Sequence, residues 1–347
     1  MASMDIFNSN AFAMTSLTAA VNSMPYKPQL LGSMGLFAAR PVRTRSVAIE
    51  EREGTLSLIQ TSAPGAPLDE RKADKRNLRS FAAVRLARGQ TITAEEIQGV
   101  RAFGSESELK QMVREVEQSL NGDTGLRAAV ELTHEHMRLG AVQGIVNDAD
   151  GSTLFNWFTE LGVSQPAEID FDLDAATPAS GALAGVCDQV VDQARRAARG
   201  AWQPGSYMVG LCGTNFWRDL IKHPEIREIY RSMLQGGFRD GLEGVLGRTQ
   251  RIEYGGIVFM KYWGTDDDSK VAVAADKAKF FPANAPGVFE VALTPAEFGP
   301  FVNTPGRELY AMVVRDRDRD AWVRPEIYSY PLHYCTRPAM LQRAKRT

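Results

Sequence analysis

The chain has 347 residues, of which 44% are hydrophobic and 24% are charged, a composition typical of a globular protein with one or two domains. Forty basic against 42 acidic residues leave a formal net charge of -2, which excludes a protein that coats nucleic acid tightly through counterion release. Three widely spaced cysteines, Cys187, Cys212 and Cys335, exclude a disulfide framework and indicate a reducing compartment. The sequence contains no apolar run long enough for a membrane span and no secretory signal, so we expect no membrane partner.

Residues 1–46 predict an extended N-terminal arm. The segment is poor in charge, and Pro25, Pro28 and Pro41 interrupt any sustained helical period, so a short helical turn is expected only around residues 14–23. The arm is too short to form its own core, but it carries too many apolar side chains to be typical of disorder. We therefore expect it to lie across neighbouring molecules.

Residues 47–86 predict a long two-stranded β-ribbon. Alternating apolar and β-branched residues over 47–61 and a second alternating run over 78–86 are typical of the two arms of a hairpin. Between them, residues 62–76 contain prolines and many charges but no core-forming period. A two-stranded ribbon is marginally stable alone, so it needs another surface on which to rest.

The tip of this ribbon is locally basic. Four of its side chains are candidate inter-subunit contacts: Arg71, Lys72, Lys75 and Arg76. Two interpretations stay open, since the cluster fits either docking against an acidic surface of a neighbouring molecule or an ordinary solvated loop.

Residues 105–180 predict a long helix followed by a hairpin. Ser105 and Glu108 have the spacing of a capping box, and apolar residues continue at helical spacing to Leu120. Residues 121–125 interrupt this helix, which resumes at Leu126. The pair Asp150-Gly151 further on predicts a tight hairpin turn.

The remainder predicts an α+β domain. The small residues of 177–181 suggest a domain boundary, after which a helix over 183–194, a strand over 207–212 and a second helix from Pro224 are expected. The further strands are expected over 257–263, 271–274, 288–293, 309–314 and 327–335.

No spacing in the sequence supports a metal or cofactor site. His134 and His136 stand two positions apart, which on a helix turns their side chains about 200° from each other, so they are interpreted as helix-surface residues. His333 and Cys335 would share one face of a strand, but no second pair of ligands accompanies them, and core packing is expected. We predict no metal ligands, no cofactor and no cofactor-binding residues.

The sequence also lacks a recognisable catalytic motif. It contains no Gly-x-Ser-x-Gly elbow, and only four histidines could act as a base. We predict a protein that is not an enzyme and has no catalytic residues; the alternative from another class is a soluble hydrolase using His223 or His333.

The order of parts, an arm, a long ribbon, a long helix, a hairpin and an α+β domain, resembles the major capsid proteins of tailed bacteriophages, the lambda capsid protein E family. Several short sequence segments, spread over nearly the whole chain, are similar to segments of that family. They are Asp5-Ile-Phe-Asn8, Met14-Thr-Ser-Leu-Thr18, Arg43-Thr-Arg-Ser-Val-Ala-Ile-Glu-Glu51, Gly54-Thr-Leu-Ser-Leu58, Ile97-Gln-Gly-Val-Arg-Ala-Phe-Gly104, Arg138-Leu-Gly-Ala-Val-Gln-Gly144, Asp148-Ala-Asp-Gly-Ser152, Asn303-Thr-Pro-Gly306 and Cys335-Thr-Arg-Pro338.

The resemblance implies the α+β Hong Kong phage-type capsid fold, with the chain divided as follows: 1–46 the N-arm, 47–104 the extended loop, 105–180 the peripheral domain with its spine helix and hairpin, 181–322 the axial domain, and 323–347 the return to the peripheral domain. The interruption at 121–125 departs from the uninterrupted spine helix of the family.

The same resemblance implies a shell protein of the virion, assembled in the host cytoplasm as hexamers and pentamers of an icosahedral head. Its implied partners are other copies of itself, scaffold, portal and decoration proteins, and weakly held packaged double-stranded DNA. The alternative with the same fold is the shell of a bacterial nanocompartment.

Overall fold

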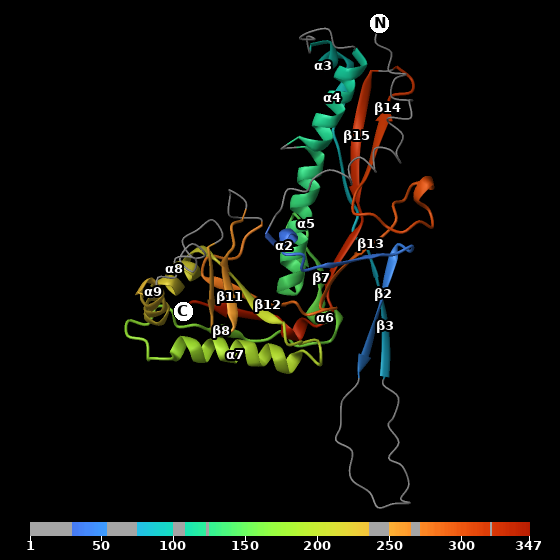
Figure 1. Ribbon diagram of the computed structural model, residues 1–347. Helices are drawn as coiled ribbons and strands as arrows, with labels where there is room; N and C mark the ends of the chain where they lie inside the picture. The colour runs from blue at the N-terminus through green and yellow to red at the C-terminus, as the bar shows by residue number, and fades with distance from the viewer. Residues whose placement is uncertain are drawn as a thin grey trace, which may run out of the picture.

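The computed structural model describes residues 30–53, 75–99, 108–122, 125–235, 250–264, 271–319 and 321–347. The molecule is elongated and consists of three parts (Figure 1): a long helical axis with strands beside it, a body built on a six-stranded sheet next to one end of that axis, and a ribbon that points away from both. The mixture of helices and strands confirms the predicted α+β class. Among the described residues, no helix is both long and apolar enough to cross a membrane.

The helical axis consists of α4 (Glu108–Asn121) and α5 (Leu126–Gln143), which follow one another in nearly one direction (Figure 1). The predicted interruption is therefore confirmed, since α4 ends at Asn121 and α5 begins at Leu126. Ser105 of the predicted capping box lies outside the described residues, and Glu108 begins α4. Gly144 ends α5 with a φ of 81°. A Cβ there would lie 2.4 Å from the Phe158 ring, so both backbone and packing require glycine.

A four-stranded sheet runs beside this axis. Its strands are β14 (Tyr310–Arg315), β15 (Trp322–Ser329) and β4 (Leu86–Gly89), with β5 (Ile92–Thr93) also paired to β15, and α3 (Ala94–Gly99) follows β5. Val116 of α4 and Val130 of α5 pack with Ile327 of β15 in one buried cluster. This shared cluster joins the two helices to the same sheet, which explains how the axis continues across its interruption.

The predicted strand over 327–335 is two strands in different sheets. β15 ends at Ser329, and β16 (Pro331–Cys335) pairs with β13 (Phe289–Leu293), which in turn pairs with β1 (Ala38–Pro41). Residues 327–335 are buried on both faces, so they show no polar–apolar alternation. The sequence therefore gave no sign that the chain passes from one sheet to another at Tyr330.

The six-stranded sheet forms the second part. In spatial order its strands are β10 (Arg251–Tyr254), β11 (Ile257–Lys261), β9 (Tyr207–Cys212), β12 (Lys277–Ala283), β17 (Gln342–Lys345) and β8 (Glu168–Asp170). The helices around it are α7 (Ala182–Ala197), α8 (Thr214–Lys222) and α9 (Pro224–Gln235). Phe280 packs with Val190 of α7, whereas Phe281 packs with Val142 of α5, so both faces of the sheet are covered.

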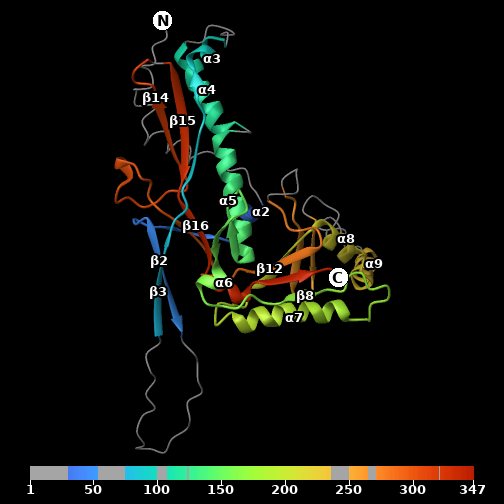
Figure 2. The same ribbon diagram turned by 180° about the vertical axis from the view of Figure 1, so that it is seen from behind.

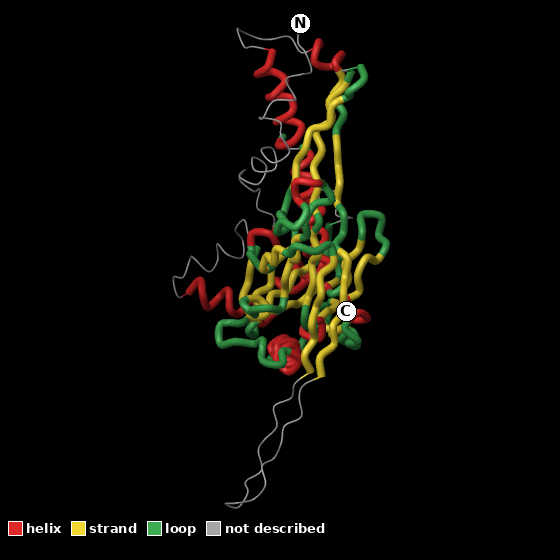
Figure 3. The backbone as a smooth tube through the Cα atoms, turned by 90° about the vertical axis from the view of Figure 1, so that its right-hand side faces the viewer, coloured by secondary structure: helices red, strands yellow, loops and turns green. Residues whose placement is uncertain are grey.

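The third part is the ribbon of β2 (Ser46–Glu53) and β3 (Lys75–Ala82), which are antiparallel with Val47 opposite Phe81. This confirms the predicted pairing of the two arms. Figures 2 and 3 show the ribbon leaving the rest of the molecule from two further directions. A second hairpin joins β6 (Ile145–Asn147) to β7 (Thr153–Asn156), followed by α6 (Trp157–Glu160), and its turn contains Gly151 with a φ of 89°, as the Asp-Gly pair predicted.

Two further differences from the sequence predictions concern single elements. The expected strand over 271–274 has no regular structure, and its backbone lies against the start of α8, where a Cβ on Gly213 would lie 2.1 Å from the Ala274 carbonyl oxygen. The central strand β12 was missed, since two lysines and Pro282 obscure its apolar alternation. The described residues also include three short helical elements: α2 (Leu30–Ser33), η3 (Gly299–Phe301) and η4 (Pro338–Met340).

Candidate functional site

The base of the ribbon is anchored in an aromatic cluster. The Phe81 ring of β3 lies edge-on to Trp157, with centroids 5.3 Å apart, and Phe155 stacks on the same indole at 5.2 Å. Val47 of β2 is buried beside them. Aromatic pairs of this kind add about 0.5–1.5 kcal/mol beyond their buried area. The end of the ribbon that adjoins residues 83–86 is therefore fixed firmly to the body of the same chain.

Beyond this cluster, the ribbon side chain with the clearest exposure is Leu78. Leu78 is 72% exposed, the largest fraction among the exposed large hydrophobic residues of the described chain. Lys75 and Arg76 begin β3, opposite Glu53 and Arg52 of β2 in the antiparallel register. Arg71 and Lys72 lie outside the described residues, so their role as contact candidates stays a prediction. At Leu78 the ribbon thus presents a largely exposed apolar side chain.

A glutamate in α5 holds part of the N-terminal arm. The Leu31 amide donates to Oε1 of Glu135 at 2.8 Å, and the Gly32 amide donates to Oε2 at 3.1 Å. The Tyr262 hydroxyl donates to the same carboxylate at 3.5 Å. Burial raises the pKa of Glu135, although these donors and Arg138 oppose that shift. Glu135 therefore binds the N-terminal arm within the same chain, by accepting hydrogen bonds from two backbone amides in the first turn of α2.

The arm continues as a strand on the same chain. β1 pairs in parallel with β13, and the Val42 amide donates to the Leu293 carbonyl at 2.9 Å. The Phe37 ring lies 5.3 Å from Phe289. Residues 30–42 therefore lie on their own chain, which corrects the expectation that the arm lies across neighbours for this part. The predicted helical turn at 14–23 lies outside the described residues.

One carboxylate connects the base of the ribbon to the segment after β13. Glu297 pairs with Arg85 at 3.0 Å and with Arg45 at 3.6 Å. The Arg85 guanidinium also lies 5.2 Å from the centre of the Tyr328 ring. These ionic contacts are partly exposed, so they orient the ribbon more than they stabilise it. Neither Glu135 nor Glu297 was identified from sequence. Each binds a residue more than 100 positions away, and no local spacing in the sequence indicates such a contact.

The histidine prediction needs correction. His134 is 3% exposed, and its Nε2 lies 2.9 Å from the Ser329 hydroxyl. Its ring is edge-on to His333 with centroids 5.3 Å apart. His134 is therefore a core residue and not a helix-surface residue, because β15 and β16 cover that side of α5. Burial lowers the pKa of His134 to about 3 and lowers that of His333 as well, so both rings are neutral at pH 7.

His134, His223 and His333 are all buried. Ser329, which pairs with His134, is fully buried and donates to the Glu308 carbonyl at 2.6 Å, so its hydroxyl cannot reach a substrate. His223 is buried at the end of α8, directly before α9 as predicted, and burial lowers its pKa. Within the described ranges, no group of three or more His, Cys, Asp or Glu side chains has the arrangement of a metal site. All three cysteines are buried and unpaired.

The family model of the phage major capsid protein E matches residues 13–346. The major capsid protein of Salmonella phage Felix O1 (isolate Felix O1-VT1) is 28% identical over 357 residues, covering 95% of each chain. That of Pseudomonas phage KPP10 is 27% identical over 316 residues, covering 87% of this chain and 88% of that protein.

A crystal structure assigned to the capsid protein of a prophage in E. coli CFT073 has a TM-score of 0.54 at 13% identity, covering 96% of this chain and 99% of that one. At that identity the likeness shows the fold alone, and it confirms the Hong Kong phage-type fold. The named relatives favour a phage shell over a nanocompartment or a hydrolase. Because the family model spans the whole molecule apart from its extreme ends, the chain belongs to the phage major capsid protein E family.

Proposed function

We propose that this capsid protein assembles as hexamers and pentamers of an icosahedral head around double-stranded DNA, with the β2–β3 ribbon of each copy resting on a neighbouring copy. The observation that carries the proposal is the ribbon itself. Its base is buried against Trp157, whereas Leu78 is 72% exposed. A surface that remains uncovered within one chain is buried when identical copies meet, and closed symmetry lets every copy give and receive the same contact.

Within this assembly we propose the division of the chain given by the resemblance: N-arm 1–46, extended loop 47–104, peripheral domain 105–180, axial domain 181–322 and C-terminal return 323–347. The sheet order refines this proposal. β8 precedes residue 181 and β17 follows residue 322, yet both belong to the six-stranded sheet. The body that carries the axial domain therefore takes one strand from each adjoining segment.

The basic tip supplies the second contact of the proposal. Arg71, Lys72, Lys75 and Arg76 would meet an acidic surface of the neighbouring copy, where complementary charge fixes orientation more than affinity. The net charge of -2 supports weak contact with the packaged DNA, because a container that held the phosphate backbone tightly would oppose packing and release.

Several wider parts of the proposal rest on family membership. They are separate scaffold, portal and decoration proteins as partners, assembly in the host cytoplasm, and the lack of any catalytic activity. The buried, neutral histidines support the last point, since neither His134 nor His333 reaches solvent.

Electron microscopy of the purified full-length protein tests the proposal directly. We expect capsomers or closed shells, together with a species much larger than 38.2 kDa in sedimentation velocity. A protein that stays monomeric across salt, pH and concentration, and with a co-expressed scaffold, would contradict it.

A further inference from the structure

One face of the six-stranded sheet carries an unbalanced set of charges at its β12–β17–β8 edge. Register places Lys279 of β12 directly opposite Arg343 of β17, and Lys277 opposite Lys345. Like charges directly opposite each other on one face of a sheet are destabilising. The adjacent strand β8 supplies Glu168 and Asp170, so these three strands present two more cations than carboxylates on that face.

The two carboxylates are already engaged. Glu168 pairs with Lys277 at 2.7 Å, and Asp170 pairs with Lys345 at 2.8 Å. Arg343 donates from Nε to the carbonyl oxygen of Pro166 at 3.0 Å. Among the described residues, no carboxylate lies within 4.0 Å of the Lys279 ammonium. This half-buried lysine therefore faces an arginine without an anionic partner of its own.

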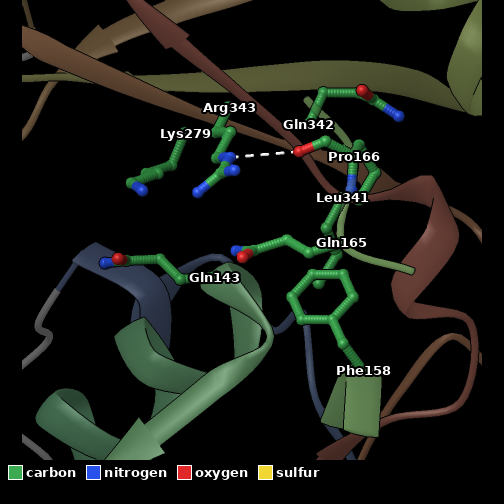
Figure 4. Close-up of a pocket in the computed structure, with 8 residues that line it drawn as sticks. All are labelled: Gln143, Phe158, Gln165, Pro166, Lys279, Leu341, Gln342 and Arg343. Atoms are coloured by element: carbon green, nitrogen blue, oxygen red, sulfur yellow. Dashed lines mark hydrogen bonds between the residues drawn. The ribbon is translucent and has the colours of Figure 1, made fainter. Parts of the chain in front are cut away.

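A pocket lies beside these two cations. In Figure 4, Lys279 and Arg343 occupy one side of it, and the amide side chains of Gln143 and Gln165 face them from the other. The buried side chains of Leu341 and Phe158 also line it. The cavity measures about 10 Å³, which is room for one oxygen-sized atom. Gln165 is exposed, so the mouth of the pocket reaches the surface.

We infer that this pocket, formed by Lys279, Arg343, Gln143 and Gln165, is a binding site for a phosphate group. One phosphate oxygen would enter the pocket between the cations, and the remaining oxygens would lie at its mouth. A phosphate accepts from an ammonium, a guanidinium and neutral amides at once, and its charge matches the excess of two cations. A carboxylate supplies less charge and fewer acceptors, so it fits this set of donors less well.

The electrostatics of the pocket agree with this assignment. Burial lowers the pKa of Lys279, and Arg343 and Lys277 lower it further, whereas only Glu168 acts in the opposite direction. Positive charge is thus unfavourable in this pocket. A bound anion would oppose the shift, because it favours the charged form of Lys279.

Thermal unfolding of the unassembled full-length protein tests the inference. We expect sodium phosphate, compared with sodium chloride at equal ionic strength, to raise the Tm saturably by about 2–4 °C. Lys279→Met should abolish this rise while raising the Tm in chloride, because it removes the repulsion by Arg343. The matched control Lys222→Met, at the exposed end of α8, should keep the full response to phosphate.

A second titration distinguishes the source of the phosphate. If Lys279→Met also weakens binding of a short double-stranded DNA severalfold in fluorescence anisotropy, the site binds the phosphates of the DNA backbone. This outcome rests on the proposed function as a shell around DNA. If DNA binding is unchanged while the phosphate response is lost, the site takes free phosphate. The inference fails if phosphate stabilises no more than chloride, if acetate gives the same saturable rise, or if Lys279→Met retains the response. Shell formation is scored separately by microscopy, so its failure would not be mistaken for failure of the site.

Discussion

The six-stranded sheet and the β2–β3 ribbon differ in how completely one chain covers them. The sheet has α7 on one face and α5 on the other, and its central side chains, such as Phe280 and Phe281, are fully buried. Among the ribbon side chains that the structure describes, Val47 and Phe81 at the base are buried beside Trp157 and Phe155, whereas Leu78 is exposed. The single chain therefore stabilises the sheet. On the proposal that the ribbon rests on a neighbouring copy, the stability of the outer ribbon should depend on protein concentration.

Deletion of residues 62–76 should give the largest effect, because it removes the far end of the ribbon and leaves its anchored base. We expect loss of closed particles in electron microscopy, with the far-ultraviolet circular dichroism and the cooperative unfolding transition of the six-stranded sheet retained. A control that replaces the same segment with a Gly/Ser linker of equal length separates chain length from chemistry. Normal particles from the deletion variant would show that the ribbon has no role in assembly.

The next test compares one residue from each region. Phe280→Ala should lower the free energy of unfolding of the unassembled protein by about 3–5 kcal/mol, because a fully buried ring that stacks on Phe171 at 5.5 Å leaves a cavity. Leu78→Ser should change that quantity by less than about 0.5 kcal/mol, since its side chain is exposed in the monomer, yet it should impair assembly. Urea unfolding and sedimentation velocity measure the two quantities. Equal destabilisation by both variants would mean that the ribbon is part of the monomer core.

The same contrast explains which features could be predicted from sequence. Elements with a local signal were found: the two arms of the ribbon, the interruption of the helix at 121–125 and the Asp150-Gly151 turn each depend on neighbouring residues. β12 was missed because its lysines belong to a charged part of the sheet. Apolar alternation identifies a strand reliably only when the strand is buried on both faces or has one face that is polar throughout. The Glu135 contact with Leu31 spans 104 positions, and single-sequence spacing carries no information at that range.

A pH titration sharpens the comparison inside the core beside α5. His134 has a folded-state pKa of about 3, below its ordinary value near 6.5, so the unfolded chain binds the extra proton and stability is lost as pH falls below about 6.5. At pH 5 this loss is about 2 kcal/mol relative to pH 8. His333 acts in the same direction, since burial is the main cause that lowers the pKa of both rings and the positive charge of Arg138 adds to it.

Glu135 acts in the opposite direction. Because its pKa is raised in the folded state, the folded protein takes up this proton at a higher pH than the unfolded chain, so this group adds stability as pH falls. His134→Gln should therefore flatten the fall in stability between pH 8 and pH 5, measured by urea unfolding. The exposed-surface control Lys222→Gln should leave the slope unchanged. An unaltered slope in His134→Gln would place the pH dependence elsewhere in the molecule.

The smallest effect belongs to the point where the arm meets the body. Glu135→Gln keeps the shape of the side chain but leaves a single acceptor oxygen for the Leu31 and Gly32 amides, which now share a carboxylate at 2.8 and 3.1 Å. A hydrogen bond to a charged group contributes about 1.5–3 kcal/mol, but the unfavourable burial of this carboxylate offsets part of that, so we expect a local loss of about 1 kcal/mol.

Because that loss is local, hydrogen exchange is the measurement that resolves it: the two amides should exchange about fivefold faster while amides of β12 keep their protection. Glu308→Gln, which removes a half-exposed carboxylate that also faces Arg138, is the matched control and should leave both amides protected. Faster exchange in β12 as well would mean that the arm and the six-stranded sheet unfold together. Residues 30–42 would then unfold as one unit with the six-stranded sheet rather than as a separate local segment.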